Sequence, residues 1–351
     1  MSEAHDPNEE LLEEAWDLLD HGKPEEAMLR ARRVLRDDPQ SAEALLVLAR
    51  GALDTHATDE ALIYAERAVD VEPESPEPRI ELAYVLGYHL DRAADALAAA
   101  REALKAAQAL NDPPAVQGAQ LCLARMLLLG NRPSEAMEVA ADLRAVRDAE
   151  PDWVAAVAEL LMDLGDAEGA EALVRQALRK AEDDIGLRRL LAEILWFDDR
   201  LEEARAELEA ILEVEPEDLE ALIGLALLLV RALGDDDAAL QACDRAMALA
   251  EDAGDAALVR WAKVLALARL GRRAEAQAER GSAGEGPFDN AENHIVAGLA
   301  LKELGEPALA RDHVKRALSL DPQNEDAQEL LAELPGNGGA GTPIAPDKVR
   351  N

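Results

Sequence analysis

Two consecutive segments of equal length decide the fold: PDWVAAVAELLMDLGDAEGAEALVRQALRKAEDD at residues 151–184 and IGLRRLLAEILWFDDRLEEARAELEAILEVEPED at residues 185–218. Alanine occupies the same two places in both, as Ala158 and Ala170 in the first and as Ala192 and Ala204 in the second. Equivalent alanines are therefore 34 residues apart. A constant period in this range predicts a stack of helix-turn-helix repeats.

The same period extends along most of the chain. Further alanines with this spacing are Ala27 and Ala61, Ala136 and Ala170, and Ala276 and Ala310. A small residue usually stands 12 positions earlier, and a proline often stands 12 positions later. Two antiparallel helices approach closely where small residues cross, so we expect the alanine pairs to mark the crossings. Proline cannot continue a helix and so closes the unit.

Composition supports an all-α protein. Of the 351 residues, 49% are hydrophobic and 3% are aromatic, and the apolar residues are mostly the helix formers Ala and Leu. Asp and Glu number 73 against 36 Lys and Arg, which gives a formal net charge of -37. This charge repels phosphate backbones and anionic headgroups, so nucleic acid and membrane surfaces are disfavoured as partners. It indicates either a solvated acidic surface or a basic partner.

Several classes of protein are disfavoured by what the sequence lacks. Cys122 and Cys243 are too far apart to suggest a disulfide framework or a zinc motif. The acidic N-terminal tail, residues 1–7, does not resemble a signal peptide, and the apolar run 222–230 is too short to span a bilayer. We therefore expect a cytoplasmic protein. The alanine content and the preference for Arg over Lys suggest a bacterial, GC-rich genome.

The residues of each unit resemble the tetratricopeptide repeat (TPR). The resemblance rests on Leu-Ala-x-x-Leu, a glycine turn, Glu-Ala and a closing Asp-Pro, best seen in Leu304-Gly305, Ala310 and Asp321-Pro322. It implies a right-handed α-solenoid of about nine repeats, residues 8–334. The glycine-rich composition of the tail, 335–351, predicts that it is disordered. The expected units are 8–41, 42–75, 76–116, 117–150, 151–184, 185–218, 219–256, 257–290 and 291–324, followed by a capping helix at 325–334.

Three units depart from the pattern. The third has one extra residue between Ala83 and Ala96 and a second helix that we expect to be lengthened, over 91–110. The seventh has an insertion that we place near the turn at 234–237. In the eighth, the glycine-rich stretch 281–287 is either a longer loop between repeats or a hinge.

No constellation of residues suggests catalysis. The six histidines are scattered without metal-ligand spacing, and no glycine-rich loop suited to phosphate is present. We therefore expect no enzyme activity, no metal and no cofactor.

The resemblance implies that the first helices of the repeats line a concave groove for a protein partner. Six of the nine aromatic residues fall on groove positions, and aromatic residues and arginine dominate binding hot spots. The alternative is that such large residues merely pack between adjacent first helices. The candidate groove residues are Trp16, Arg50, Tyr84, Tyr88, Arg125, Arg189, Trp196, Phe197 and Trp261.

Some TPR co-chaperones hold acidic tails through a clamp of lysine and asparagine. The corresponding places here are Leu12, Trp16, Leu46, Arg50, Ile80 and Tyr84, so this clamp is missing. We instead expect an adaptor that binds an apolar or amphipathic partner segment, with a few acidic contacts to Arg50, Arg125 or Arg189. The alternatives are a self-associating scaffold, or an assembly or secretion accessory factor. The sequence leaves the partner and the oligomeric state open.

Overall fold

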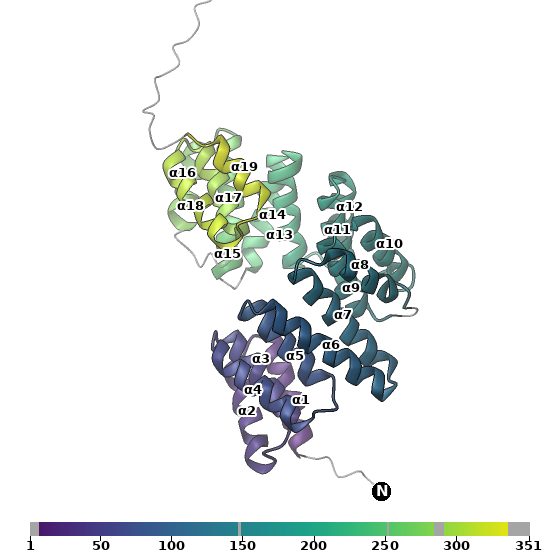
Figure 1. The fold of residues 1–351 in the computed structure, drawn as a ribbon. Helices are drawn as coiled ribbons and strands as arrows, with labels where there is room; N and C mark the ends of the chain where they lie inside the picture. The colour runs from purple at the N-terminus through teal and green to yellow at the C-terminus, as the bar shows by residue number, and fades with distance from the viewer. Residues whose placement is uncertain (1–6, 147–148, 251–252, 284–290, 336–351) are drawn as a thin grey trace, which may run out of the picture. The chain divides into compact units, whose positions relative to one another are not determined.

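The computed structural model describes residues 7–146, 149–250, 253–283 and 291–335. Over these residues the chain forms nineteen α-helices and two π-helical turns, without a strand (Figure 1). Helices that follow one another in sequence pack as antiparallel pairs, so the predicted all-helical repeat fold is confirmed. The chain divides into two compact units, residues 1–179 and 180–351, which are described separately.

Unit 1 contains five helix pairs. The odd-numbered helix is the first helix of each pair and the even-numbered helix is the second. The helices are α1 (Pro7–Asp20), α2 (Pro24–Asp37), α3 (Ala42–Asp54), α4 (Thr58–Val71), α5 (Glu77–Tyr84), α6 (Ala93–Leu110), α7 (Pro113–Leu129), α8 (Pro133–Arg144), α9 (Pro151–Asp163) and α10 (Ala167–Leu178). The π-helical turn η1 (Val85–His89) extends α5.

Unit 2 contains four helix pairs and a final single helix. The helices are α11 (Ile185–Phe197), α12 (Leu201–Val214), α13 (Leu219–Leu228), α14 (Asp236–Leu249), α15 (Ala253–Arg269), α16 (Arg273–Ala283), α17 (Ala291–Glu303), α18 (Pro307–Leu320) and α19 (Glu325–Glu333). The π-helical turn η2 (Leu229–Leu233) extends α13. The last helix, α19, packs against α17 and α18, in the place expected for a cap.

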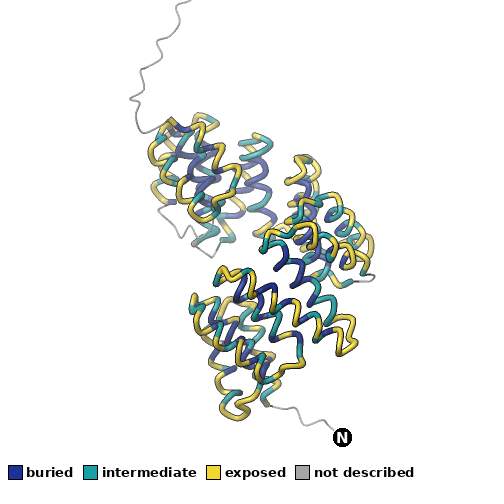
Figure 2. The backbone as a smooth tube through the Cα atoms, in the orientation of Figure 1, coloured by how far each residue is buried: buried dark blue, intermediate teal, exposed yellow. Residues whose placement is uncertain are grey.

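The alanines of the repeat lie in the core. Ala158 and Ala170 are fully buried, as are Ala204 and the equivalent alanines of unit 1, and Ala192 is 3% exposed. Figure 2 shows the buried backbone along the facing sides of the helices and the exposed backbone on their outer sides and turns. A larger side chain at these positions would hold the paired helices apart, which explains why alanine recurs with the period of the fold.

Each of the nine described hairpins turns on one residue with a left-handed backbone. These residues are Gly22, His56, Asp91, Asn131, Gly165, Asp199, Gly234, Gly271 and Gly305. In seven of the hairpins, the N–H of the next residue donates to a carbonyl five residues back, for example from Arg200 to Leu195 at 2.8 Å. This bond satisfies a free carbonyl at the end of the first helix.

The two remaining hairpins accommodate one extra residue. In these the N–H reaches six residues back, from Arg92 to Leu86 at 2.8 Å and from Asp235 to Leu229 at 3.1 Å. The extra residue of the third repeat is therefore taken up by η1. The insertion expected near 234–237 corresponds to η2, which ends directly before Gly234 and takes up the extra residue inside the helix, while Gly234 keeps the ordinary turn conformation.

Several expected boundaries can be compared with the helices. The second helix expected over 91–110 spans Ala93–Leu110. Of the glycine-rich stretch 281–287, the first three residues belong to α16, and the rest lies outside the described residues. The tails lie outside them as well, except Pro7, which begins α1, and Pro335. None of the described helices combines the length and the apolar character that crossing a membrane requires.

Candidate functional site

Three of the candidate residues in unit 1 connect one first helix to the next. The Trp16 Nε1–H donates to Glu43 Oε1 at 3.1 Å, between α1 and α3. Arg50 Nη2 donates to Glu81 Oε2 at 3.1 Å, and Arg125 Nη2 donates to Glu159 Oε2 at 3.1 Å. These contacts support the alternative in which large residues at groove positions link adjacent helices.

The tyrosines of α5 and η1 form an aromatic cluster with Arg125. The rings of Tyr84 and Tyr88 stack with centroids 6.0 Å apart and an interplanar angle of 20°. Burial raises the pKa of Tyr84 to about 12, with the neighbouring Cys122 adding to the shift and the Arg125 guanidinium opposing it. Tyr88, within η1, remains 52% exposed. The structure therefore brings together the three residues Tyr84, Tyr88 and Arg125, and Tyr88 offers a free aromatic surface.

In unit 2 the end of α11 carries two aromatic residues beside a cavity. The cavity has a volume of about 860 Å³, and both Trp196 and Phe197 line it. Phe197 is 69% exposed, more than any other large hydrophobic side chain among the described residues. Leu208, Ile223 and Leu227 contribute apolar surface to the same cavity.

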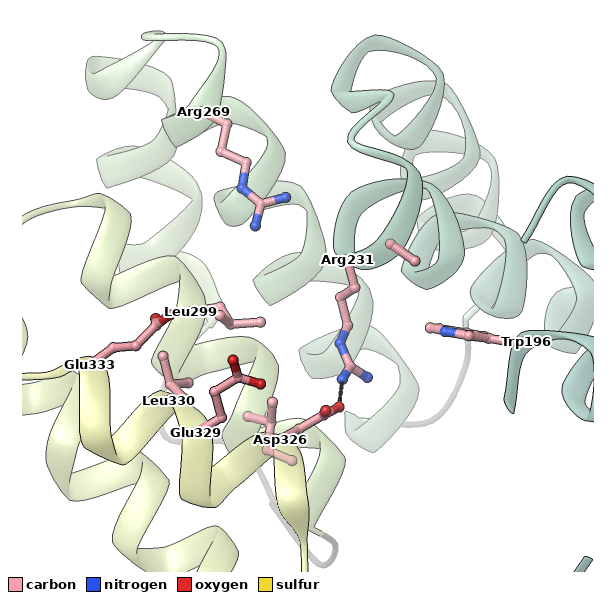
Figure 3. A pocket seen from close by; sticks show the side chains of 10 residues that line it. Trp196, Arg231, Arg269, Leu299, Asp326, Glu329, Leu330 and Glu333 are labelled. Carbon is pink, nitrogen blue, oxygen red and sulfur yellow. Dashed lines mark hydrogen bonds and ion pairs between the residues drawn. The ribbon is translucent and has the colours of Figure 1, made fainter. Parts of the chain in front are cut away.

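Arg231, carried by η2, lies at the centre of this region. Its guanidinium carbon lies 5.8 Å from the centroid of the Trp196 ring, within the range of a cation–π interaction. The same guanidinium pairs with Glu292 of α17 and with Asp326 of α19, and Figure 3 shows the second of these pairs. A second cavity of about 310 Å³ shares Trp196, Arg231 and Asp326 with the first. We call the two adjoining cavities the Trp196 groove.

Trp261 does not lie on an open face. It is 3% exposed and its ring centroid lies 5.8 Å from that of His313 on α18. Its helix, α15, packs against both α16 and α17. The structure therefore corrects the assignment of Trp261 to the groove: it is a core residue.

The arginines expected to contact acidic residues of a partner already pair with carboxylates of this protein. Arg50 and Arg125 already pair with Glu81 and Glu159. Arg189 of α11 pairs with Glu220 and lies 3.7 Å from Asp218 Oδ2. Sequence reasoning missed these carboxylates, although a signal exists: Arg125 and Glu159 are one repeat apart, so they occupy equivalent places on adjacent helices.

The described residues offer no arrangement suited to a metal or to thiol chemistry. They contain no group of three or more His, Cys, Asp or Glu side chains that could hold a metal ion. Cys122 and Cys243 are both buried, and burial raises the pKa of each thiol to about 12. Both thiols therefore remain protonated at neutral pH.

The comparison with protein families gives the same assignment as the repeat geometry. Three models described as tetratricopeptide repeat match residues 12–77, 161–229 and 291–324. The chain belongs to the tetratricopeptide repeat family. Repeats of this kind point to protein partners. A search of curated proteins found no significant match.

Solved structures resemble the chain in fold. A chain from the crystal structure of the APC/C hetero-tetramer Cut9–Hcn1 aligns with a TM-score of 0.54 and 14% identity over 92% of this chain. The match covers 55% of that chain, so the present protein spans about half its length. The thermophilic TPR protein TTC0263 of Thermus thermophilus matches at 23% identity over 54% of this chain and 99% of its own, with a TM-score of 0.46. A TPR protein from Parabacteroides merdae matches at 16% identity over 93% of this chain and 97% of its own, with a TM-score of 0.40.

Proposed function

We propose that this TPR protein is a non-enzymatic adaptor that holds an apolar or amphipathic segment of another protein in the Trp196 groove. One observation carries the proposal: Phe197 exposes 69% of its surface at the edge of a cavity of about 860 Å³. Exposed aromatic residues beside a concave apolar surface are typical of binding hot spots. The repeat boundaries given above remain part of this proposal, with nine units and a final cap.

We place a second binding surface of this protein at the aromatic cluster of Tyr84, Tyr88 and Arg125 in unit 1, for the same partner or for another one. The exposed Tyr88 ring lies over a Tyr84 ring that packing already holds in place. Little side-chain entropy is then lost when a partner covers this surface, which favours binding.

The groove is tested by a pair of apolar truncations on neighbouring helices. Phe197→Ala removes the exposed ring of α11, whereas Val214→Ala removes a side chain that is 59% exposed at the end of α12. Affinity capture from native extract compares both variants with the unaltered protein, after circular dichroism has shown equal helicity. We expect a captured protein that is lost with Phe197→Ala and retained with Val214→Ala.

The same experiment separates the competing functions. If all three proteins capture the same partner equally, the Trp196 groove is not the binding site. If they capture only further copies of this chain, the self-associating scaffold replaces the adaptor.

A further inference from the structure

We propose that the segment held in the Trp196 groove is basic, with lysine or arginine residues beside an apolar anchor. This inference rests on the proposed function and adds the chemistry of the partner. Its support comes from three features of the groove: the charge of its lining, the pairing state of its arginines, and its exposed aromatic surface.

The lining of the groove carries an excess of carboxylates. Across the two cavities there are seven of them against three guanidinium groups, a formal excess of four negative charges, or three when the pairing of Glu333 with Lys302 is included. The carboxylates come from five different helices or their flanks, so the charge surrounds the groove. They are Glu193, Glu220, Asp255, Glu292, Asp326, Glu329 and Glu333.

The three arginines of the lining are already neutralised by the protein itself. Arg189 contacts Asp218 and Glu220, and Arg231 contacts Glu292 and Asp326. The third, Arg269, lies within 3.9 Å of one carboxylate oxygen on each of two acidic side chains, Asp236 and Glu303. An acidic partner would have to displace these pairs and enter a negative field, whereas a basic partner is attracted by it.

The aromatic residues suit the same partner. One side of the Trp196 ring interacts with the Arg231 guanidinium, which shows that a cation is accommodated there. Figure 3 shows Trp196 and the acidic residues of α19 on different sides of Arg231. The exposed Phe197 ring adds surface for an aliphatic side chain or for a second guanidinium.

The test compares two synthetic amphipathic peptides of about 16 residues, roughly four helical turns. They share one leucine pattern, and their polar positions are lysine in one peptide and glutamate in the other. Fluorescence anisotropy of the labelled peptides measures binding to the full chain. We expect the leucine–lysine peptide to bind, the leucine–glutamate peptide not to bind, and affinity to fall about tenfold when NaCl is raised from about 0.05 M to about 0.5 M.

A matched pair of variants separates the groove from the overall charge of the protein. Glu193→Gln with Glu329→Gln removes two charges from the groove, and Glu213→Gln with Glu217→Gln removes two from the exposed end of α12 and its following turn. We expect the groove variant to weaken binding of the leucine–lysine peptide about tenfold and the α12 variant to change it less than about twofold. Equal weakening by both variants would mean that net charge alone attracts the peptide, and the inference would be overturned.

Phe197→Ala distinguishes a failure of this inference from a failure of the proposed function. If the leucine–glutamate peptide binds as well and Phe197→Ala abolishes its binding, the groove binds proteins but does not select a basic one. If the leucine–lysine peptide binds regardless of Phe197→Ala, the groove assignment itself fails. If neither peptide binds, the basic amphipathic segment is the wrong partner.

Discussion

At the scale of single residues, the hairpin turns all contain a left-handed backbone conformation, which different residue types adopt. Every described hairpin needs a left-handed residue, and glycine fills five of the nine positions. At Asp199, with φ of 58°, a side chain with Cβ adopts this conformation at a steric cost. The equivalent residue of the preceding repeat, Gly165, adopts it without a side chain.

We expect Asp199→Gly to stabilise unit 2 by about 0.5–1 kcal/mol, because relief of the left-handed strain exceeds the added entropy of the unfolded chain. Gly165→Ala is the converse control and should destabilise by about 1 kcal/mol. Urea unfolding followed by circular dichroism measures both. A loss of stability with Asp199→Gly would show that the aspartate side chain contributes an interaction stronger than the strain.

At the scale of helices, the alanine crossings set how closely each pair can pack. Ala204 is fully buried on α12, whereas Ala206 on the same helix is exposed. We expect Ala204→Leu to reduce the free energy of unfolding by about 1–3 kcal/mol, since the larger side chain must push α11 away. Ala206→Leu makes the same chemical change without a neighbour to displace and should alter it by less than about 0.5 kcal/mol. Equal effects of the two in urea unfolding would contradict this account of the period.

The helices show how far the sequence alone carries the fold. The spacing of alanines predicts the helix pairs because only a small side chain fits where two helices cross closely, as at the buried Ala204. The same spacing reveals an extra residue between Ala83 and Ala96, but not that a π-helical turn absorbs it, because a loop and a bulge both add one residue. In the seventh repeat the sequence likewise indicates an insertion near 234–237, but only the structure shows that η2 takes up the extra residue.

The candidate site was less accessible to sequence reasoning than the fold. Periodicity places a residue on a face but does not say what covers that face, which is why Trp261 was assigned to the groove and is found in the core. Ion pairs between residues of different repeats likewise cannot be predicted from the sequence of one repeat. Arg231 contacts Asp326 although the two are 95 positions apart in the sequence. They come together only because the repeats between them stack on one another.

The two π-helical turns relate the length of a repeat to the position of its contact residues. Each lies where a repeat has one extra residue, and each carries a candidate contact residue, Tyr88 in η1 and Arg231 in η2. A π turn rotates the residues that follow it relative to a regular helix, so one added residue changes which side chain faces the partner surface. Such turns often mark functional positions, and here both lie beside the surfaces proposed for binding.

At the scale of the whole molecule, the dominant feature is the excess of acidic residues, which the repeat fold itself does not need. Many of the ion pairs are short-range and exposed, such as Arg92 with Asp95 and Arg200 with Glu203. Exposed pairs of this kind contribute only about 0.2–1 kcal/mol each. With 73 acidic residues against 36 basic ones, about half of the carboxylates have no cation to pair with, and their mutual repulsion opposes the compact state.

We therefore expect added salt to stabilise the protein at neutral pH. Raising NaCl from about 0.01 M to about 0.15 M shortens the screening length from about 30 Å to about 8 Å, which weakens long-range repulsion more than it weakens pairs in contact. The melting temperature, followed by circular dichroism, should rise by about 2–4 °C for each kcal/mol of repulsion removed. Near the isoelectric point of about 4.4 the net charge is small, so the same addition of salt at about pH 5 should have a smaller effect. A melting temperature that falls with salt at neutral pH would show that the ion pairs of the protein outweigh the repulsion between its carboxylates.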